Sequence, residues 1–153
     1  MEIRTIRPKS QKDFNVSVDL LNEIFSEFPD FKPYTTEFAY NRTKGKNPLI
    51  LEVYDNEQII AYALCYDRIK GYLHIWDIGT KKAFRGKGIA SKIYDHIEKY
   101  AKVNNYQGVT LNTFNRFANN IRLLLARGYE IFDIETKGEF KNDPKIHMRL
   151  KFK

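Results

Sequence analysis

Residues 78–90 read Ile-Gly-Thr-Lys-Lys-Ala-Phe-Arg-Gly-Lys-Gly-Ile-Ala and form the most informative segment of the chain. Gly86 and Gly88 let the backbone turn with its N–H groups facing inward. The helix that follows adds unpaired N–H groups and the positive end of its dipole. Such an arrangement favours an anion, most often a phosphate. A tight strand-to-helix turn with solvated Arg85 and Lys87 is the alternative interpretation.

The residues around this segment predict strands before it and alternating helices and strands after it. Three expected strands, rich in Ile, Leu, Val and Tyr, precede it as an antiparallel meander: 49–54, 59–67 and 72–80. Apolar residues at four-residue steps, from Ile89 to Ala101, predict a helix that runs to about Val103. A strand over 109–114, a helix over 119–127 and strands over 129–136 and 145–152 are expected to follow.

The N-terminal part predicts a strand over 2–7, a helix over 12–28 and a short helix over 36–42. The expected order is therefore β-α-α-β-β-β-α-β-α-β-β. A strand-helix-strand unit normally joins parallel strands by a right-handed crossover, so the sheet should be mixed. We predict an α/β fold in which a mainly antiparallel sheet of about seven strands is flanked by about four helices, as one domain over residues 1–153.

The composition is that of an ordinary globular domain. The chain has 153 residues, 42% of them hydrophobic, and a single cysteine, Cys65. A domain of this length buries enough surface to need no disulfide or structural metal. A lone thiol and the absence of a signal peptide favour a cytoplasmic setting. No apolar run approaches the ~20 residues that cross a bilayer, so we expect no membrane partner. No His, Cys, Asp or Glu set has metal-ligand spacing, so we predict no metal.

The segment Arg85–Ala90, RGKGIA, resembles the signature of the GNAT superfamily of acyl-CoA-dependent N-acetyltransferases. That signature is Arg or Gln, two residues, Gly, one residue, then Gly or Ala, which here correspond to Arg85, Gly88 and Ala90. The resemblance covers nearly the whole chain, because the order of elements also agrees. It implies transfer of an acetyl group from acetyl-CoA to a primary amine by direct attack in a ternary complex, with a small-molecule or peptide amine as acceptor. Dimers are frequent in this family, so the resemblance is compatible with a homodimer, and the sequence leaves the oligomeric state open.

The resemblance also implies where acetyl-CoA binds. The backbone of the signature would enclose the pyrophosphate, and two strand residues would offer backbone groups to the pantetheine arm. A further contact would come from Asn115, although this residue lies two positions too far from Gly128 for the family's spacing. The expected cofactor-binding residues are thus Ile78, Thr80, Arg85, Gly86, Lys87, Gly88, Ile89, Ala90 and Asn115.

The catalytic residues depart from the family pattern. Family members often have a carboxylate base where this chain has His74 and Trp76. His74 is the first candidate for the base, since a neutral imidazole accepts a proton near neutral pH. Strand alternation places Asp77 on the opposite face from His74 and Trp76, which makes it the weaker alternative.

The usual general acid, a Tyr four residues before the Gly of a closing Gly-Phe pair, is replaced by Leu124. Water, Tyr34 or Tyr62 would then protonate the thiolate.

Two other functions compete with an enzyme. The missing carboxylate and Leu124 motivate a non-catalytic CoA-binding module. The formal net charge of +7 and the many aromatic residues motivate a nucleic-acid-binding domain. We expect no nucleic-acid partner, however, because basic and acidic residues alternate along the chain and no known nucleic-acid motif is present.

Overall fold

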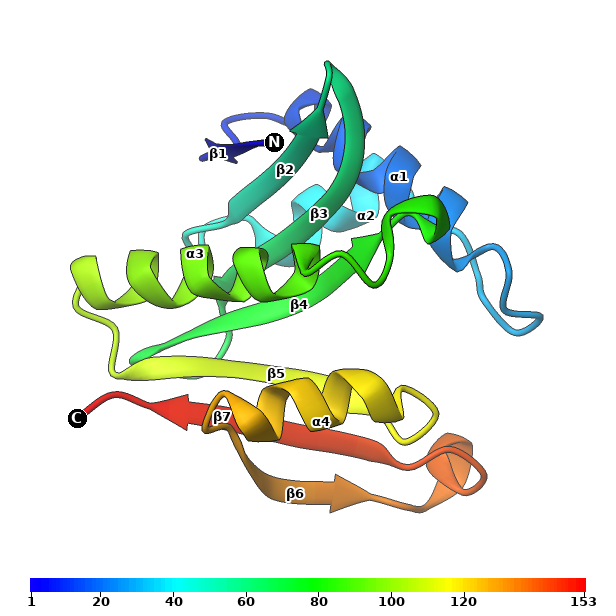
Figure 1. Ribbon diagram of the computed structural model, residues 1–153, viewed down its shortest axis with the longest axis vertical. Helices are drawn as coiled ribbons and strands as arrows, with labels where there is room; N and C mark the ends of the chain where they lie inside the picture. Colours follow the sequence, from blue (N-terminus) through cyan, green and yellow to red (C-terminus); the bar gives the residue numbers. More distant parts are fainter.

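The computed structural model describes residues 1–153, and Figure 1 labels the main elements. The strands are β1 (Glu2–Ile6), β2 (Leu49–Asp55), β3 (Gln58–Asp67), β4 (Tyr72–Thr80), β5 (Gly108–Phe114), β6 (Glu130–Glu135) and β7 (Lys145–Lys151). The helices are α1 (Asn15–Phe25), α2 (Thr36–Thr43), α3 (Ile89–Val103) and α4 (Ala118–Ala126). Short 3-10 turns lie at Gln11–Phe14, Lys82–Phe84 and Gly138–Phe140. The predicted α/β class and the predicted order of the main elements are confirmed.

One sheet contains all seven strands in the order β1-β2-β3-β4-β5-β7-β6. Every neighbouring pair is antiparallel except β4 and β5, which are joined through α3 and run parallel. This parallel pair is the crossover predicted for a strand-helix-strand unit. The mixed, mainly antiparallel sheet is therefore confirmed as well.

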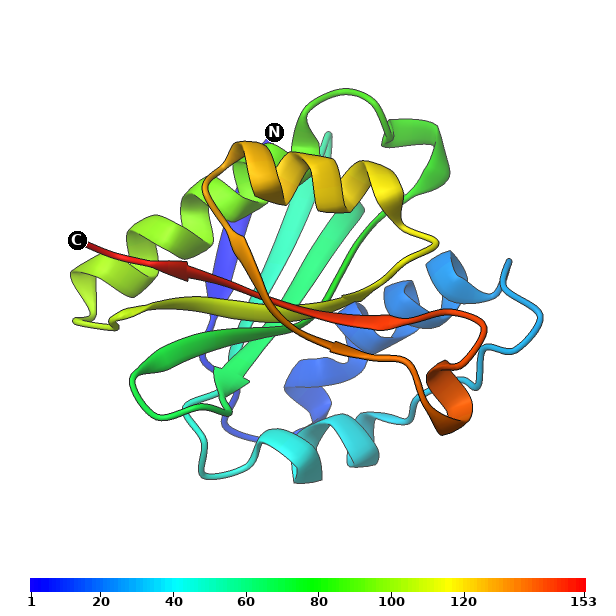
Figure 2. The same cartoon turned by 90° about the horizontal axis from the view of Figure 1, so that it is seen from below.

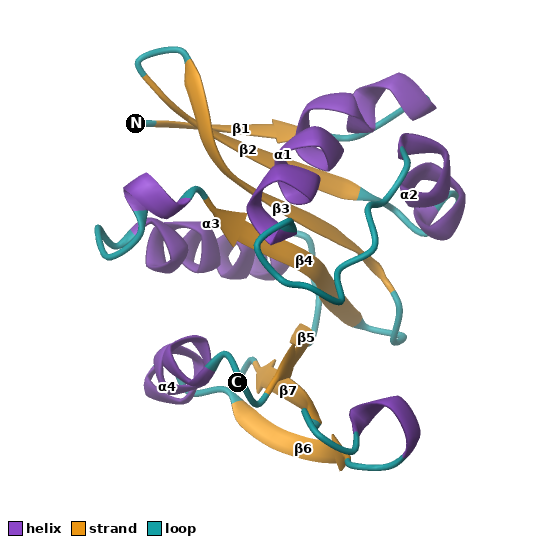
Figure 3. Cartoon of the chain, turned by 90° about the vertical axis from the view of Figure 1, so that its right-hand side faces the viewer, coloured by secondary structure: helices purple, strands orange, loops and turns teal.

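The parallel pair is short, and this divides the sheet into two halves. β4 and β5 are paired only from Tyr72 opposite Gly108 to Ile75 opposite Leu111. Beyond that point β4 stays with β3 as far as Thr80, and β5 stays with β7 as far as Phe114. Figure 3 shows the half formed by β1–β4 diverging from the half formed by β5–β7. The ends of β4 and β5 therefore carry backbone groups that the other strand does not satisfy.

Helices lie on both faces of the sheet, with α3 and α4 on one face and α1 and α2 on the other (Figure 2). Twenty buried residues form the core under α3 and α4, among them Ile93, Ile97 and Leu124. A second cluster of nine buried residues joins α1 and α2 to β2 and β3, with Phe14 and Leu21 among its members. The four-residue periodicity of α3 thus reflects its buried face.

The helix expected over 12–28 is shorter than predicted. It begins with the 3-10 turn at Gln11–Phe14 and ends at Phe25, where Ser26 forms the last helical hydrogen bond, to Asn22. Pro29 has no N–H and disfavours the helical conformation for the residue before it, so Phe28 lies in a turn. The expected helical stretch from Ser26 to Phe28 is therefore part of the segment that connects α1 to α2.

Candidate active site

A β-bulge in β4 places Asp77 on the face of the sheet that α1 and α2 cover. Ile75 is opposite Cys65 and Asp77 is opposite Leu64, so Trp76 is an extra residue without a partner on β3. Trp76 packs with the α1 and α2 cluster that contains Leu64, and the next residue in the alternation, Gly79, faces Ile24 of α1. The extra residue resets the alternation of side chains. The prediction that Asp77 faces away from Trp76 is thus wrong.

Asp77 has the properties of a base at neutral pH. Its Oδ1 accepts a hydrogen bond of 2.8 Å from the Tyr62 hydroxyl. Burial raises the pKa of Asp77 to about 7, and the hydrogen bonds from Tyr62 and from the backbone of Ile78 oppose that rise. A carboxylate of this pKa takes up and releases protons in the range where an amine has to be deprotonated.

Aromatic side chains line the approach to Asp77 from α1 and α2. Tyr34 stacks on Trp76 with ring centroids 5.5 Å apart, and Phe38 lies 6.1 Å from Trp76. Asn22 of α1 holds the backbone of Tyr34 with two hydrogen bonds of 2.8 Å, one to its carbonyl and one from its N–H. Because α1 fixes this segment, the rings form a wall with a defined position rather than a free loop.

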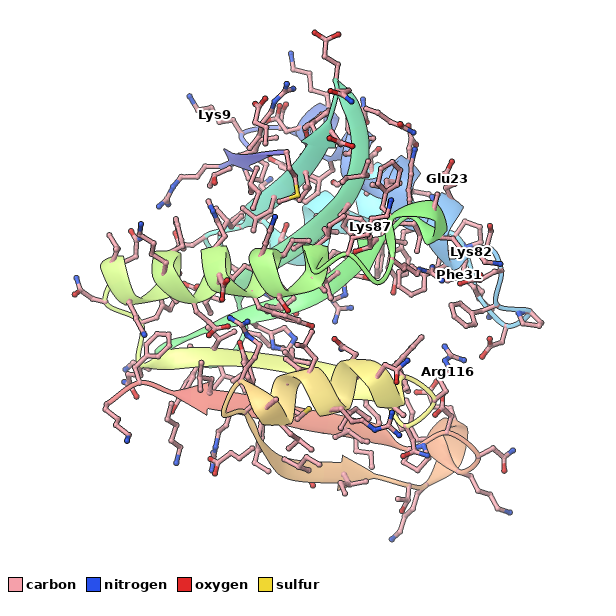
Figure 4. The ribbon with its side chains drawn as sticks, viewed as in Figure 1. Lys9, Glu23, Phe31, Lys82, Lys87 and Arg116 are labelled. Atoms are coloured by element: carbon pink, nitrogen blue, oxygen red, sulfur yellow. The ribbon has the colours of Figure 1, made fainter.

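The connection between α1 and α2 also contacts the other half of the sheet. This contact is made with Arg116, which follows β5. Arg116 lies 3.7 Å from Asp30 and 3.4 Å from Asp143, and its guanidinium lies 4.8 Å from the ring centroid of Phe28. Figure 4 shows Arg116 extending toward the segment that carries Phe31. The connection between α1 and α2 therefore contacts the loop after β5 and borders the space between the diverging strands.

His74 is buried, with 2% of its surface exposed. Its Nδ1 lies 2.9 Å from Thr110 Oγ1, and its ring packs against Tyr66. Burial, together with the positive charges of Arg68 and Arg42, lowers the pKa of His74 to about 3. The imidazole therefore stays neutral at neutral pH and has little tendency to take a proton, so the geometry favours Asp77 over His74 as the base.

The glycine loop before α3 has the backbone expected of an anion site. Gly86 and Gly88 have φ angles of 76° and 78°, which side chains other than glycine rarely adopt. A Cβ atom at either position would meet nothing within 4 Å, so the loop borders open space. Gly88 is the N-cap of α3 and no side chain caps the helix. The first N–H groups of α3 are therefore open to a bound anion.

The cations of this loop do not all gather around it. Arg85 donates from Nε to the Thr80 carbonyl at 3.1 Å, and its Nη2 lies 3.2 Å from Glu27 at the end of α1. Lys81 lies 3.8 Å from Glu23 of α1. Lys82 and Lys87 remain exposed and unpaired (Figure 4). The Arg85 side chain thus braces the loop against α1, and the backbone is the part that faces outward.

The backbone of Ile78 and Thr80 points toward the gap between β4 and β5. The Lys81 N–H donates to the Ile60 carbonyl at 2.8 Å, so these two residues form a hydrogen-bonded pair of the antiparallel ladder between β3 and β4. Hydrogen-bonded and non-hydrogen-bonded pairs alternate along such a ladder. The pairs Thr80 with Ala61 and Ile78 with Ala63 are then the non-bonded ones. The Thr80 carbonyl accepts from Arg85 and the Ile78 N–H donates to Asp77, so the Ile78 carbonyl and the Thr80 N–H are the backbone groups left for a ligand.

The structure brings Asn115 and Leu124 to places of little chemical use. Asn115 is exposed and is held only through its N–H, which donates to the Pro144 carbonyl at 3.0 Å. Leu124 is fully buried in the core under α4. Sequence reasoning missed the contact that joins α3 to α4, in which the Tyr94 hydroxyl donates to Asn120 at 2.9 Å. No sequence pattern marks that pair, because it joins two helices distant in the chain.

Two further features bear on the class of protein. The structure contains no group of three or more His, Cys, Asp or Glu side chains that could hold a metal ion. None of its helices combines the length and the hydrophobicity that crossing a bilayer requires.

Solved structures share this fold over nearly the whole chain, whereas a search of curated proteins found no match. An aminoglycoside 6'-N-acetyltransferase complexed with coenzyme A matches with a TM-score of 0.76 and 11% identity, over 99% of this chain and 97% of that one. An IAA acetyltransferase from Bacillus cereus matches with a TM-score of 0.74 and 15% identity, over 99% and 100%. The ribosomal-protein-S18-alanine N-acetyltransferase from Escherichia coli matches with a TM-score of 0.73 and 14% identity, over 98% and 94%.

These structural similarities show the fold alone, and a family model shows the membership. The model described as the acetyltransferase (GNAT) family matches residues 17–129, which include the bulged strand with Asp77 and the glycine loop with Gly86 and Gly88. The chain is a member of the GNAT acetyltransferase family.

Proposed function

We propose that this protein is an N-acetyltransferase that moves the acetyl group of acetyl-CoA to a primary amine by direct attack in a ternary complex. The observation that carries the proposal is Asp77, a carboxylate whose pKa is raised to about 7 at the point where β4 and β5 diverge. Family membership supports acetyl transfer, and the aminoglycoside 6'-N-acetyltransferase with the same fold is complexed with coenzyme A.

The residues present fit acetyl-CoA. The open backbone at Gly86 and Gly88 and the uncapped start of α3 suit the pyrophosphate, since N–H groups and a helix dipole bind phosphate. The Ile78 carbonyl and the Thr80 N–H, which face the gap between β4 and β5, suit an amide-rich chain such as pantetheine. Lys82 and Lys87 add positive charge beside the loop.

Asp77 acts as the general base: it takes a proton from the ammonium form of the acceptor and leaves the neutral amine. Tyr34 and Trp76 hold the acceptor beside this carboxylate, and Tyr62 keeps the carboxylate in one orientation through its hydrogen bond. Acetyl-CoA, when bound, supplies a thioester whose C–S bond breaks as the amine nitrogen bonds to the acetyl carbon. The Tyr34 hydroxyl, whose pKa is raised by burial, is our candidate donor of the proton that the sulfur takes up.

The test is a screen of acetyl-CoA turnover over small amines, amino acids and peptides, read as release of the CoA thiol and as acetylated product by mass. We expect amine-dependent release with at least one class, and no acetylated enzyme when the amine is omitted. Binding of acetyl-CoA without turnover on any amine would instead favour the non-catalytic module, for which the burial of Leu124 in the core is the specific observation.

Tyr62→Phe should move the pH dependence of the reaction without abolishing it. The Tyr62 hydroxyl lowers the pKa of Asp77, so its removal raises that pKa and shifts the half-maximal rate to higher pH. The measurement is the pH profile of kcat/KM. Tyr54→Phe is the matched control, because the Tyr54 hydroxyl also donates to a carboxylate, that of Glu52 at 2.7 Å, but on β2. Equal profiles for wild type and Tyr62→Phe would contradict the role of Tyr62.

A further inference from the structure

Two arginines without a salt bridge, Arg42 and Arg68, lie near His74, close enough for both to lower its pKa. Arg42 of α2 holds its guanidinium 4.8 Å from the ring centroid of Trp76. Arg68 lies in the turn between β3 and β4, and both side chains belong to exposed residues. Neither forms a salt bridge, whereas salt bridges are formed by Arg4, Arg85, Arg116, Arg127 and Arg149. Two guanidinium groups without a salt bridge thus lie close to the part of β4 that carries His74 and Trp76.

Asn112 places Arg68 at the point where the strands diverge. Asn112 directly follows Leu111, the last residue of β5 that pairs with β4. With the amide oriented to satisfy both of its ends, the Asn112 oxygen accepts from Arg68 Nη1 at 2.7 Å and its nitrogen donates to His147 Nδ1 at 2.7 Å. The other ring nitrogen of His147 lies 2.6 Å from Glu135, a carboxylate whose pKa Arg68 also lowers but with which Arg68 forms no salt bridge.

The field of both arginines reaches the interior of the site. After burial, Arg68 and Arg42 are the main causes that lower the pKa of His74, which lies two residues before Trp76. Tyr34, stacked on Trp76, has Asp77 and Arg42 as its two charged neighbours. One carboxylate and two cations therefore act on the same part of the site, and a molecule bound beside Tyr34 and Trp76 would experience both charges.

We infer that the acceptor is an amine that also carries a carboxylate, which Arg42 and Arg68 bind while the amine reaches Asp77. The inference rests on the proposed function and names its substrate class. A guanidinium presents paired N–H donors whose spacing matches a carboxylate. The stacked rings of Tyr34 and Trp76 suit the carbon skeleton between the two charged ends. A purely cationic acceptor would face repulsion from the same two arginines.

The transfer step is unchanged in this inference. The amine gives its proton to Asp77, its nitrogen bonds to the acetyl carbon, the C–S bond breaks and the sulfur leaves as a thiol after protonation. The acceptor carboxylate takes no part in bond making and serves to position the amine. Arg42 and Arg68 are therefore positioning residues. Their substitution should change how strongly the enzyme prefers one acceptor over another.

The test compares free amino acids with their amides as acceptors. The amide of each pair has the same skeleton without the charge, and its amine is less basic, so a larger fraction is deprotonated at neutral pH. Without an anion subsite the amide should react faster. We expect kcat/KM to be at least about 10-fold higher for the acid of the best pair, in line with charge-assisted hydrogen bonds. A preference for the acid thus runs against intrinsic reactivity.

The variants Arg42→Gln and Arg68→Gln should each lower the ratio of acid to amide about 10-fold or more. Both side chains are exposed, so we expect the variants to fold, and thermal unfolding checks this. Arg4→Gln is the matched control, because Arg4 also lies over a ring, that of Tyr54 at 3.9 Å, but on the edge strand β1. Its acid-to-amide ratio should equal that of the wild type.

Three outcomes separate the possibilities. The inference is supported if the preference for the acid falls in both Arg42→Gln and Arg68→Gln and persists in Arg4→Gln. The inference would be overturned, and the proposed function would stand, if amides reacted as well as acids. The same holds if neither Arg42→Gln nor Arg68→Gln changed the acid-to-amide ratio. Failure of every amine in the presence of bound acetyl-CoA would overturn the proposed function and the inference together.

Discussion

Asp77→Asn is expected to lower kcat/KM about 10²- to 10⁴-fold, the range typical of a lost general base. Asparagine has nearly the same shape and its oxygen still accepts the Tyr62 hydroxyl, so the fold should be kept while the proton acceptor is removed. The loss corresponds to roughly 3–5.5 kcal/mol of activation free energy. Steady-state rates with the acceptor found in the amine screen provide the measurement.

The pH profile makes this prediction specific to the base. In the wild type the rate should rise as Asp77 ionises, through its pKa of about 7, and level off above it. In Asp77→Asn this rise should be absent. Asp67→Asn is the matched control, since Asp67 also accepts a tyrosine hydroxyl, that of Tyr106 at 2.7 Å, at the opposite end of β3. If Asp77→Asn kept the rise, the base would lie elsewhere, and His74→Ala would then be the variant to examine.

The same substitution should stabilise the fold at high pH. The pKa of Asp77 is raised from 3.8 in the unfolded chain to about 7 in the fold, so the folded state holds its proton more tightly. Its contribution to stability is therefore present below pH 3.8, is lost as the pH rises to about 7, and changes no further above that. The stability of Asp77→Asn relative to the wild type should increase across this interval, by on the order of a few kcal/mol.

Denaturant unfolding of both proteins at several pH values between 4 and 8 checks this expectation. Lower activity together with higher stability would show that the fold keeps the Asp77 carboxylate in an energetically unfavourable environment because catalysis requires it there. A constant stability difference over the whole range would show that Asp77 titrates equally in the folded and unfolded chain, and would remove the raised pKa from the mechanism.

Gly88→Glu is expected to lower the affinity for acetyl-CoA at least about 100-fold. The new side chain would enter the open space beside the loop and place a carboxylate where phosphates are expected, and like charges in close contact repel strongly. The measurement is the increase in thermal stability that acetyl-CoA causes. A ligand at about 100 times its Kd adds about 2.7 kcal/mol to the free energy of unfolding of the wild type. In the variant this stabilisation should be absent.

Gly45→Glu is the control for this variant. Gly45 has a φ of 76°, close to the 78° of Gly88, also with nothing within 4 Å of a Cβ, but it lies in the connection between α2 and β2. Both variants therefore carry the same charge and the same cost of about 1–2 kcal/mol for a left-handed non-glycine residue. The control should keep the wild-type response to acetyl-CoA. Wild-type affinity in Gly88→Glu would exclude this loop as the phosphate site.

The sequence by itself determined the local features of this protein. The order of strands and helices follows from short-range periodicity, as in the step from Ile89 to Ala101. The glycine loop is equally local, because a left-handed backbone at Gly86 and Gly88 depends on the residues themselves. Ile78 and Thr80 were named from the resemblance of the glycine loop to the family signature, which is also a local feature of the sequence.

Only the tertiary structure decided which charged groups serve chemistry. The bulge at Trp76 depends on how β4 pairs with β3, and it moved Asp77 to the face that strict alternation denies it. Burial of His74 depends on Thr110 and Tyr66, which are distant in sequence, and it made a weak base of a residue that suits the role when exposed. A pKa is set by such surroundings and not by residue type alone. Likewise, Arg42 of α2 and Arg68 of the β3–β4 turn both act on His74 only because the tertiary structure brings these two segments close to β4.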